Sequence, residues 1–394
     1  MNIKTSLKSL IAFLIKHFNR VVPLFFTQSI LLRFFGIHLR IVNQQLTLEF
    51  REITVCKYKN GAKGAFCFSI DYDFPVQPRN VDDIETIFSK AVGNLIDLSE
   101  KYHIPITWGI CGETAIQNIN LFKRIGESII PHDLGVHTYS HLDLSNSDYT
   151  AHEIRQDISQ CIESINTHDQ PTSFIFPWNR EKHWDLLRDL GFIAYRGKIN
   201  GFRTIGPPDY HNKLWNISET YYLNEKSIDE VPIICSLIDI AIAYQGVFHL
   251  WSHPWNLHKF GDVHNYQKNV TQPIMEHIST QRDMNKLWIC TMQEMAYYSE
   301  ARRRSIIKDI EISDNETKFS IECQIEDNRY VSSPMLTIKV KVPLPYDSLQ
   351  VFLDHDEVLY GNIWWKNREE PQYIFINICF EHTSLHVLIK HIAM

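Results

Sequence analysis

The sequence predicts an α/β protein, with a (β/α) barrel over residues 59–304 followed by an antiparallel β-sandwich over residues 305–394. Short apolar runs alternate with segments of helical character between residues 60 and 300, which is typical of parallel strands joined by crossover helices. Seven or eight such units in about 240 residues fit a barrel. After residue 304 the apolar runs are rich in Val, Ile, Phe and Tyr and no long helix intervenes, which indicates antiparallel sheets.

The expected barrel strands are short apolar runs bounded by polar or turn residues. Between several of them lie helical segments, such as residues 81–101 and 149–166. The predicted barrel strands are residues 65–70, 105–110, 134–137, 173–177, 193–195, 231–234, 246–250 and 287–290, and those of the sandwich include 337–342, 349–353 and 373–380.

Residues 1–58 are expected to form a basic, helical N-terminal arm. The first 48 residues hold six basic side chains and no Asp or Glu, so the net charge of −7 belongs to an acidic body behind this arm. From Leu7 to Phe18 the apolar side chains recur on one helical face. The apolar runs are too short for a secretory signal or a membrane span. This helix either lies on a membrane surface or packs against protein, and both interpretations stay open.

Composition excludes several classes of protein. The net negative charge provides no basic footprint for nucleic acid. The eight cysteines contain no CxxC pair, which argues against a zinc ribbon and a thioredoxin motif. Scattered reduced thiols indicate a cytoplasmic protein, which the basic arm would allow to sit peripherally on the inner membrane face.

Acidic and imidazole side chains gather where predicted strands end. Asp71 and Asp73 close the run 65–70, and His137 and His141 follow the run that begins at residue 134, while His253 follows the run 246–250. Barrel enzymes carry their sites at the carboxyl ends of their strands. The pattern therefore predicts one site to which all three strands contribute.

These residues give the sequence a resemblance to the polysaccharide deacetylase family, carbohydrate esterase family 4. Its Asp-x-Asp motif is similar to residues 69–73 and its His-Thr-x-x-His motif to residues 137–141. The third and last motifs are similar to residues 175–178 and 250–253, in degenerate form, and residues 105–108 resemble the second-strand signature. The resemblance covers residues 60–300 and implies a distorted barrel of the deacetylase type.

The resemblance also implies a role for each residue of the first two motifs and for one late histidine. Asp71 would be the catalytic base, and Asp73, His137 and His141 would bind a divalent metal ion, with zinc expected first and cobalt, manganese, nickel or iron as alternatives. Two imidazoles and a carboxylate leave open positions on such an ion. His253 would correspond to the general acid that protonates the leaving amine.

One departure from the family concerns the arginine that orients the base. The third motif has Ile175 where the family has arginine. Arg180 or Arg196 could supply the cation to Asp71 from a shifted position. Loss of this cation would lower activity.

Aromatic residues near the motifs are candidates for the substrate site. Flat rings with polar edges are suited to stacking on sugars, although the same residues could simply pack the barrel rim. The candidates for substrate binding or for the oxyanion hole are Tyr139, Pro177, Trp178 and Trp251.

The resulting functional hypothesis is a metal-dependent deacetylase that removes an N-acetyl or related acyl group from an amino sugar in a glycan or a glycolipid precursor. One alternative is a deformylase or amidase of the same fold acting on a lipid-linked or non-sugar amide. Another is a catalytically silent glycan-binding or assembly protein. The expected partners are an N-acylated sugar and, through residues 1–40, a membrane surface; the oligomeric state stays open.

Overall fold

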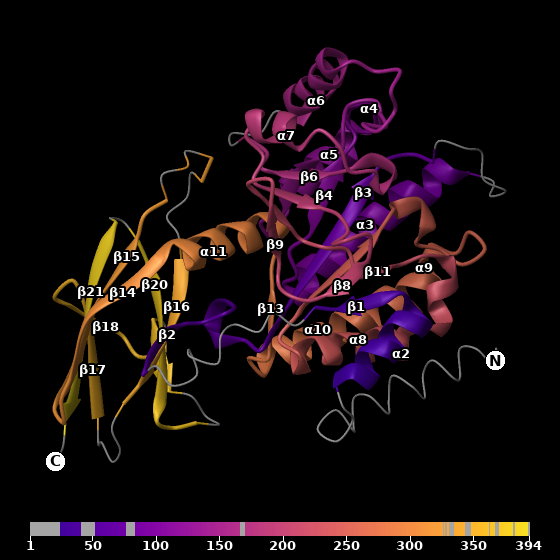
Figure 1. Ribbon diagram of the computed structural model, residues 1–394. Coiled ribbons are helices and arrows are strands. Elements are labelled where there is room, and N and C mark those ends of the chain that lie inside the picture. The colour runs from indigo at the N-terminus through magenta and orange to yellow at the C-terminus, as the bar shows by residue number, and fades with distance from the viewer. Residues whose placement is uncertain are drawn as a thin grey trace. The chain divides into compact units, whose positions relative to one another are not determined.

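The chain divides into two compact units, seen in a computed structural model (Figure 1). The first comprises residues 1–41 and 64–296, and the second residues 42–63 and 297–394. The structure describes residues 24–40, 52–75, 83–165, 170–325, 327, 329–330, 335–342, 348–361, 363–366, 370–380 and 383–392. The predicted amphipathic helix of residues 7–18 lies outside this part of the chain.

The first unit is built around one curled sheet of parallel strands in the order β11–β12–β3–β4–β5–β6–β7–β10–β9, with β13 beside β3. Only β9 is antiparallel to its neighbour, β10. These strands are β3 Gly64–Tyr72, β4 Thr107–Ile110, β5 Asp133–Val136, β6 Ser173–Ile175, β7 Ala194–Arg196, β9 Asp209–His211, β10 Leu214–Asn216, β11 Tyr221–Tyr222, β12 Val247–Ser252 and β13 Leu287–Ile289. The predicted distorted (β/α) barrel is thereby confirmed.

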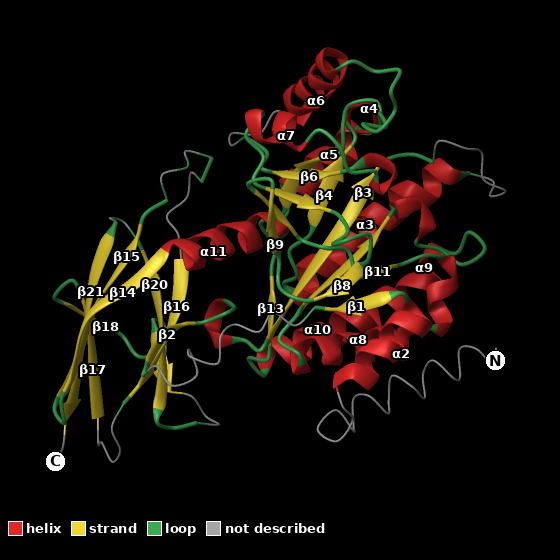
Figure 2. Cartoon of the chain, viewed as in Figure 1, coloured by secondary structure: helices red, strands yellow, loops and turns green. Residues whose placement is uncertain are grey.

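Helices accompany the strands along the chain (Figure 2). They are α3 Ile84–Tyr102, α4 Gly112–Gln117, α5 Ile119–Gly126, α6 Ala151–Ile165, α7 Trp184–Asp189, α8 Val231–Ala243, α9 Val263–Tyr266, α10 Gln272–Asp283 and α11 Met292–Arg304. In α3 the carboxylate of Asp83 caps the first turn by accepting from the Thr86 amide. Its apolar stripe, which includes Phe88 and Leu95, is buried in the core.

The side chains of β3 alternate between the hydrophobic core and the interior of the barrel. Phe66, Phe68 and Ile70 belong to the hydrophobic core of the first unit. Successive side chains of a strand point to opposite faces, so Ser69 and Asp71 face the barrel interior. All nine residues of β3 are buried, as expected of a central parallel strand.

One predicted strand is wrong. Residues 231–234 form the first turn of α8 instead of a strand. Pro232 at the start of the helix suits that position, since the first turn needs no amide donor there. The apolar run continues to Ala243 and is largely buried, so the helix lacks the polar face that would have distinguished it from a buried strand.

Two antiparallel sheets form the second unit, in agreement with the predicted sandwich. One has the order β14–β15–β21–β17–β18 and the other β19–β20–β16–β2. Their strands are β2 Ile53–Val55, β14 Ser305–Ile312, β15 Glu316–Cys323, β16 Met335–Lys341, β17 Ser348–Leu353, β18 Asp356–Val358, β19 Trp364–Lys366, β20 Tyr373–Cys379 and β21 Ser384–Ile392.

The segment before residue 58 contains more than a helical arm. A helix, α2 Leu24–Phe35, is followed by β1 Ile37–Leu39, which pairs with β8 Arg203–Ile205 in the first unit. Strand β2 pairs with β16 in the second unit, because its β-branched run Ile-Thr-Val completes the edge of that sheet. Among the described residues no helix is both long and apolar enough to cross a membrane.

Candidate active site

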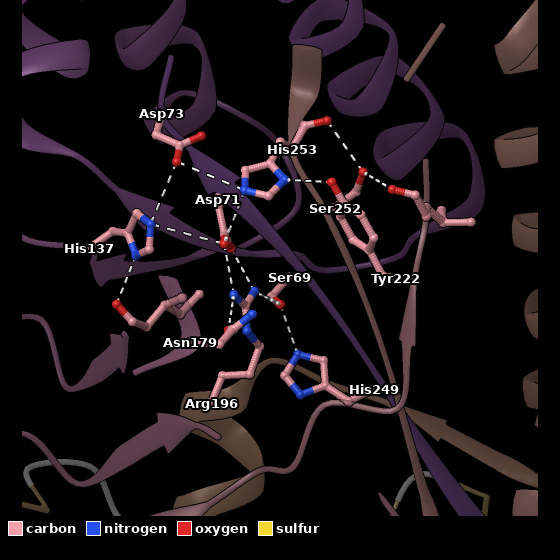
Figure 3. Close-up of polar contacts among 12 residues, drawn as sticks. Ser69, Asp71, Asp73, His137, Asn179, Arg196, Tyr222, His249, Ser252 and His253 are labelled. Carbon is pink, nitrogen blue, oxygen red and sulfur yellow. Dashed lines mark hydrogen bonds and ion pairs between the residues drawn. The ribbon is translucent and has the colours of Figure 1, made fainter. Parts of the chain in front are cut away.

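Three parallel strands bring the predicted site residues to one edge of the sheet (Figure 3). Asp71 lies near the end of β3 and Asp73 just beyond it, His137 directly follows β5, and His253 directly follows β12. Strand β3 pairs in parallel with both β4 and β12, and β4 pairs with β5. Because these strands share one direction, their carboxyl ends meet at the same edge.

Asp73, His137 and His141 form a candidate metal centre. One potential ligand atom of each lies within 4.8 Å of the others. The Asp73 Oδ2 atom is 3.1 Å from His141 Nε2 and 3.7 Å from His137 Nε2. Positive φ angles of 63° at Thr138 and 58° at His141 accompany the turn between the two histidines.

A hydrogen bond fixes the tautomer and the orientation of the His137 ring. Its Nδ1 atom donates to the Ile175 carbonyl at 2.8 Å, since a carbonyl can only accept. This leaves the lone pair of Nε2 directed at Asp73, and Nε2 is buried without a hydrogen-bond partner among the described residues. A buried imidazole nitrogen without a partner, beside a carboxylate and a second imidazole, is a donor set that fits a divalent transition metal.

The electrostatics of this cluster favour a cation. Burial alone would raise the pKa of Asp73, but His253, His137 and His141 beside it hold that pKa well below its ordinary value. Burial alone would lower the pKa of His137, yet the neighbouring Asp73 and Asp71 raise it. Two buried carboxylates thus create a negative site.

Arg196 holds Asp71 in a bidentate ion pair. The two terminal guanidinium nitrogens lie 2.6 Å and 2.7 Å from the two carboxylate oxygens, and the Arg196 side chain is fully buried. Burial alone would raise the pKa of Asp71, but Arg196 and, to a smaller extent, His137 and His253 hold it below its ordinary value. Asp71 is therefore ionised.

The structure distinguishes the two arginines considered from the sequence. Arg196 on β7 is the direct partner of Ile175 on β6 in the strand register. Arg196 on the adjacent strand therefore provides, at the same position in the register, the cation that the third motif lacks. Arg180 has an exposed side chain and pairs with Asp143 instead.

His253 lies close to both Asp71 and Asp73. Its Nε2 atom is 3.6 Å from Asp71 Oδ2 and 3.9 Å from Asp73 Oδ2. Its ring stacks on Trp255, with 4.5 Å between the centroids, and its Nδ1 atom lies 3.2 Å from the Tyr222 hydroxyl. Burial and Arg196 lower the pKa of His253, although Asp73 and Asp71 oppose this.

The predicted aromatic candidates have different positions. Trp178 is half exposed and its ring meets that of His141 edge-on, at 5.1 Å, while Pro177 beside it is buried. Trp251 is buried with its ring 4.3 Å from the Arg196 guanidinium carbon, so this face is taken by an arginine. Tyr139 packs on the hydrophobic core. Of the four, only Trp178 offers an exposed ring.

Several contacts in the site have no counterpart in the sequence reasoning. The Tyr222 hydroxyl contacts His253, and Asn179 accepts a hydrogen bond from Arg196 at 3.2 Å. Neither Tyr222 nor Asn179 belongs to a sequence motif with a recognisable spacing. Asn179 directly follows Trp178 and could have been found by extending the third motif by one residue. Tyr222 lies in a strand of two residues and had no signal.

Fold and site together define an α/β barrel protein with an Asp-His-His centre at the carboxyl edge of its sheet. Residues 80–192 match the sequence model of the polysaccharide deacetylase family. This region carries His137 and His141, so the resemblance of this part of the chain to the family is confirmed.

One solved structure is similar in fold. A crystal structure described as a polysaccharide deacetylase from Mycobacterium smegmatis is similar with a TM-score of 0.51 and 16% identity, over 64% of this chain and 94% of that chain. Two others have TM-scores of 0.46 over 61% of this chain. One is described as a polysaccharide deacetylase from Pseudomonas aeruginosa PAO1, at 12% identity over 92% of its length, and the other is the PuuE allantoinase, at 13% over 91%. No curated protein sequence matches the chain.

Proposed function

We propose that this protein is a metal-dependent hydrolase that removes an N-acetyl or related acyl group from an amino sugar in a glycan or glycolipid precursor. The observation that carries the proposal is the convergence of Asp71, Asp73, His137, His141 and His253 on one buried point. This constellation contains the groups that amide hydrolysis requires: a cation site, a fixed carboxylate and an imidazole.

Asp73, His137 and His141 would hold the ion. Their oxygen and two nitrogens suit zinc first, with cobalt, manganese, nickel and iron as alternatives. A divalent ion at this position would polarise the amide carbonyl and lower the pKa of water. The Ile175 carbonyl keeps the His137 ring oriented, which is the outer support that such ligands usually have.

Asp71 is the proposed base. Arg196 occupies both of its oxygens from one side, so the carboxylate cannot rotate and its remaining lone pairs face His137 and His253. A metal ion held by Asp73, His137 and His141 would acidify the attacking water, so a carboxylate of low pKa at Asp71 would suffice to accept its proton. The water oxygen adds to the amide carbon as its proton passes to Asp71.

His253 is the proposed acid. Its Nε2 atom points toward both aspartates, and from this position it would protonate the leaving nitrogen as the carbon–nitrogen bond breaks. The products are a carboxylate and a free amino sugar. Trp178, with its half-exposed ring beside His141, is the proposed stacking surface for the sugar, and its backbone amide the proposed donor to the oxyanion.

Metal analysis combined with an acetate-release assay on N-acetylglucosamine oligomers tests this function. We expect a bound divalent ion, loss of acetate release on chelation, and recovery when zinc is returned. Asp73→Asn should lose both metal and activity. Asp143→Asn, which removes a carboxylate that pairs with Arg180 outside the cluster, should keep both. A pure, folded protein that binds no divalent ion would overturn the proposal.

The basic N-terminus favours a second candidate of the same chemistry, an amide hydrolase or deformylase acting on a lipid-linked substrate. The first 48 residues carry six basic side chains and no acidic ones, a charge pattern that anionic membranes attract. We propose a cytoplasmic protein that binds the inner membrane face through residues 1–40. Cosedimentation with anionic liposomes should require the basic side chains of this segment, and equal binding after Lys4, Lys8 and Lys16 are replaced by glutamine would contradict the membrane role.

A catalytically silent protein now has less support. Its main argument was the missing third-motif arginine at Ile175, and Arg196 supplies an equivalent cation from the next strand. Turnover lost in Asp71→Asn while glycan binding persists would argue for catalysis over binding alone.

A further inference from the structure

A chain of buried hydrogen bonds lies behind Arg196, on the side away from the candidate metal centre (Figure 3). Arg196 Nη1 lies 3.1 Å from Ser69 Oγ, and Ser69 Oγ lies 2.9 Å from His249 Nε2. His249 Nδ1 lies 2.8 Å from the Ile217 carbonyl. Ser69, Arg196 and His249 are each fully buried.

The groups at the two ends of this series of hydrogen bonds determine which group donates in each bond. The Ile217 carbonyl can only accept, so His249 carries a proton on Nδ1. Arg196 can only donate, so Ser69 Oγ accepts from it and must give its own hydrogen to His249 Nε2. His249 is therefore neutral, and burial and the nearby Arg196 charge lower its pKa to about 3.

This chain completes a clamp around the guanidinium. The two inner hydrogens of Arg196 go to Asp71, and Ser69 and Asn179 accept on the two flanks, at 3.1 Å and 3.2 Å. The Trp251 ring lies against the guanidinium at 4.3 Å. Acceptors on both flanks prevent the guanidinium from rotating in its plane, and the ring restricts it to that plane.

Strand geometry explains why Ser69 can act in this way. Ser69 is two residues before Asp71 on β3 and therefore on the same inward face. Its partner in the strand register is Trp251 on β12, two residues beyond His249. The base, the serine and the histidine thus lie on two adjacent strands that the register holds rigidly together.

We propose that Ser69 and His249 are positioning residues that hold Arg196, and through it Asp71, in the orientation needed to take a proton from water. This inference rests on the proposed hydrolase function. Neither residue reaches substrate in this arrangement, because Arg196 stands between them and Asp71. Their loss should affect kcat and leave substrate binding and metal content intact.

Variants of the buried serine test the activity side of the proposal. Ser69→Ala should lower kcat about 10-fold, the scale of lost outer support at such sites, with KM and the bound metal unchanged. Ser69→Thr keeps the hydroxyl and should restore kcat. The matched control is Ser173→Ala, a buried inward-facing serine on β6 that donates to Asp133, and it should turn over like the wild type.

Nitrogen NMR of the histidine side chains in the full-length wild-type protein tests the same series of hydrogen bonds and needs no activity measurement. The variant His249→Gln assigns the His249 signal. We expect His249 to carry its proton on Nδ1 from pH 5 to pH 9. A proton on Nε2, or wild-type kcat in Ser69→Ala, would overturn the proposal. Absence of hydrolase activity in the wild type together with the expected tautomer would reject the function and leave the hydrogen-bonded chain in place.

Discussion

Asp71 and Arg196 form the most deeply buried ion pair of the candidate site, and the pair illustrates how a missing motif residue can be replaced. The guanidinium is fully buried and bonds both carboxylate oxygens. Such a pair is costly to assemble but more costly to break, since the remaining charge stays buried without a partner. The pair is therefore important for folding as well as for the orientation of Asp71, the proposed base.

Replacing Arg196 by glutamine should reveal both roles. Arg196→Gln leaves the Asp71 carboxylate buried without its cation, so we expect a loss of about 3–5 kcal/mol in the free energy of unfolding at pH 7. Acetate release should fall as well. Denaturant titration gives the first quantity. Arg180→Ala is the control, because it breaks an exposed pair and should cost no more than about 1 kcal/mol.

At the scale of elements, Asp133 joins strands and a helix at the end of the barrel opposite the site. It begins β5, and its Oδ2 atom accepts hydrogen bonds from Thr107 on β4, from Ser173 on β6 and from the Gln293 amide in the first turn of α11. Burial raises its pKa to about 6, although these three donors oppose the shift. Compared with the unfolded chain, the folded state therefore favours the protonated form of Asp133.

Stability should depend on pH through Asp133. Its pKa is about 6 when folded and about 3.9 when unfolded, so its protonation contributes stability that is complete below about pH 4 and is lost as the pH rises through 6. Relative to Asp133→Asn, which does not titrate, the wild type should lose on the order of 2 kcal/mol between pH 4.5 and pH 7.5. Parallel pH profiles of the two proteins would contradict this.

For the whole molecule, the division into two units predicts how metal affects unfolding. Asp73, His137 and His141 all belong to the first unit, which includes residues 64–296. A ligand that binds only the folded state stabilises it by mass action, by about 4 kcal/mol at a free concentration 1,000 times its Kd. That stabilisation should be confined to the unit that holds the site.

Scanning calorimetry can separate the two units. We expect zinc to raise the temperature of one transition and to leave the other unchanged, because the sandwich residues contribute nothing to the cluster. Asp73→Asn should abolish the shift. An equal shift of both transitions would show that the units unfold together.

The sequence by itself determined the fold class and picked out the residues that converge at the candidate site. Alternating apolar runs and helical segments identified the barrel. Asp71, Asp73, His137, His141 and His253 were recognisable because each lies at or shortly beyond the carboxyl end of a strand, a position that local pattern reveals. Seven predicted barrel strands overlap observed ones. The strand predicted at 231–234 was wrong because an apolar run that is buried on most sides shows no helical periodicity in its hydrophobic pattern.

Only the tertiary structure decided which groups support that site. The strand register, and no spacing along the chain, places Arg196 opposite Ile175 and joins Ser69 to His249 across adjacent strands. Tyr222 reaches His253 across 31 residues of sequence. Such contacts depend on which strands become neighbours and at what offset, and these are properties of the packed sheet. Local periodicity can place a residue at the end of a strand but does not contain the register that chooses its partners.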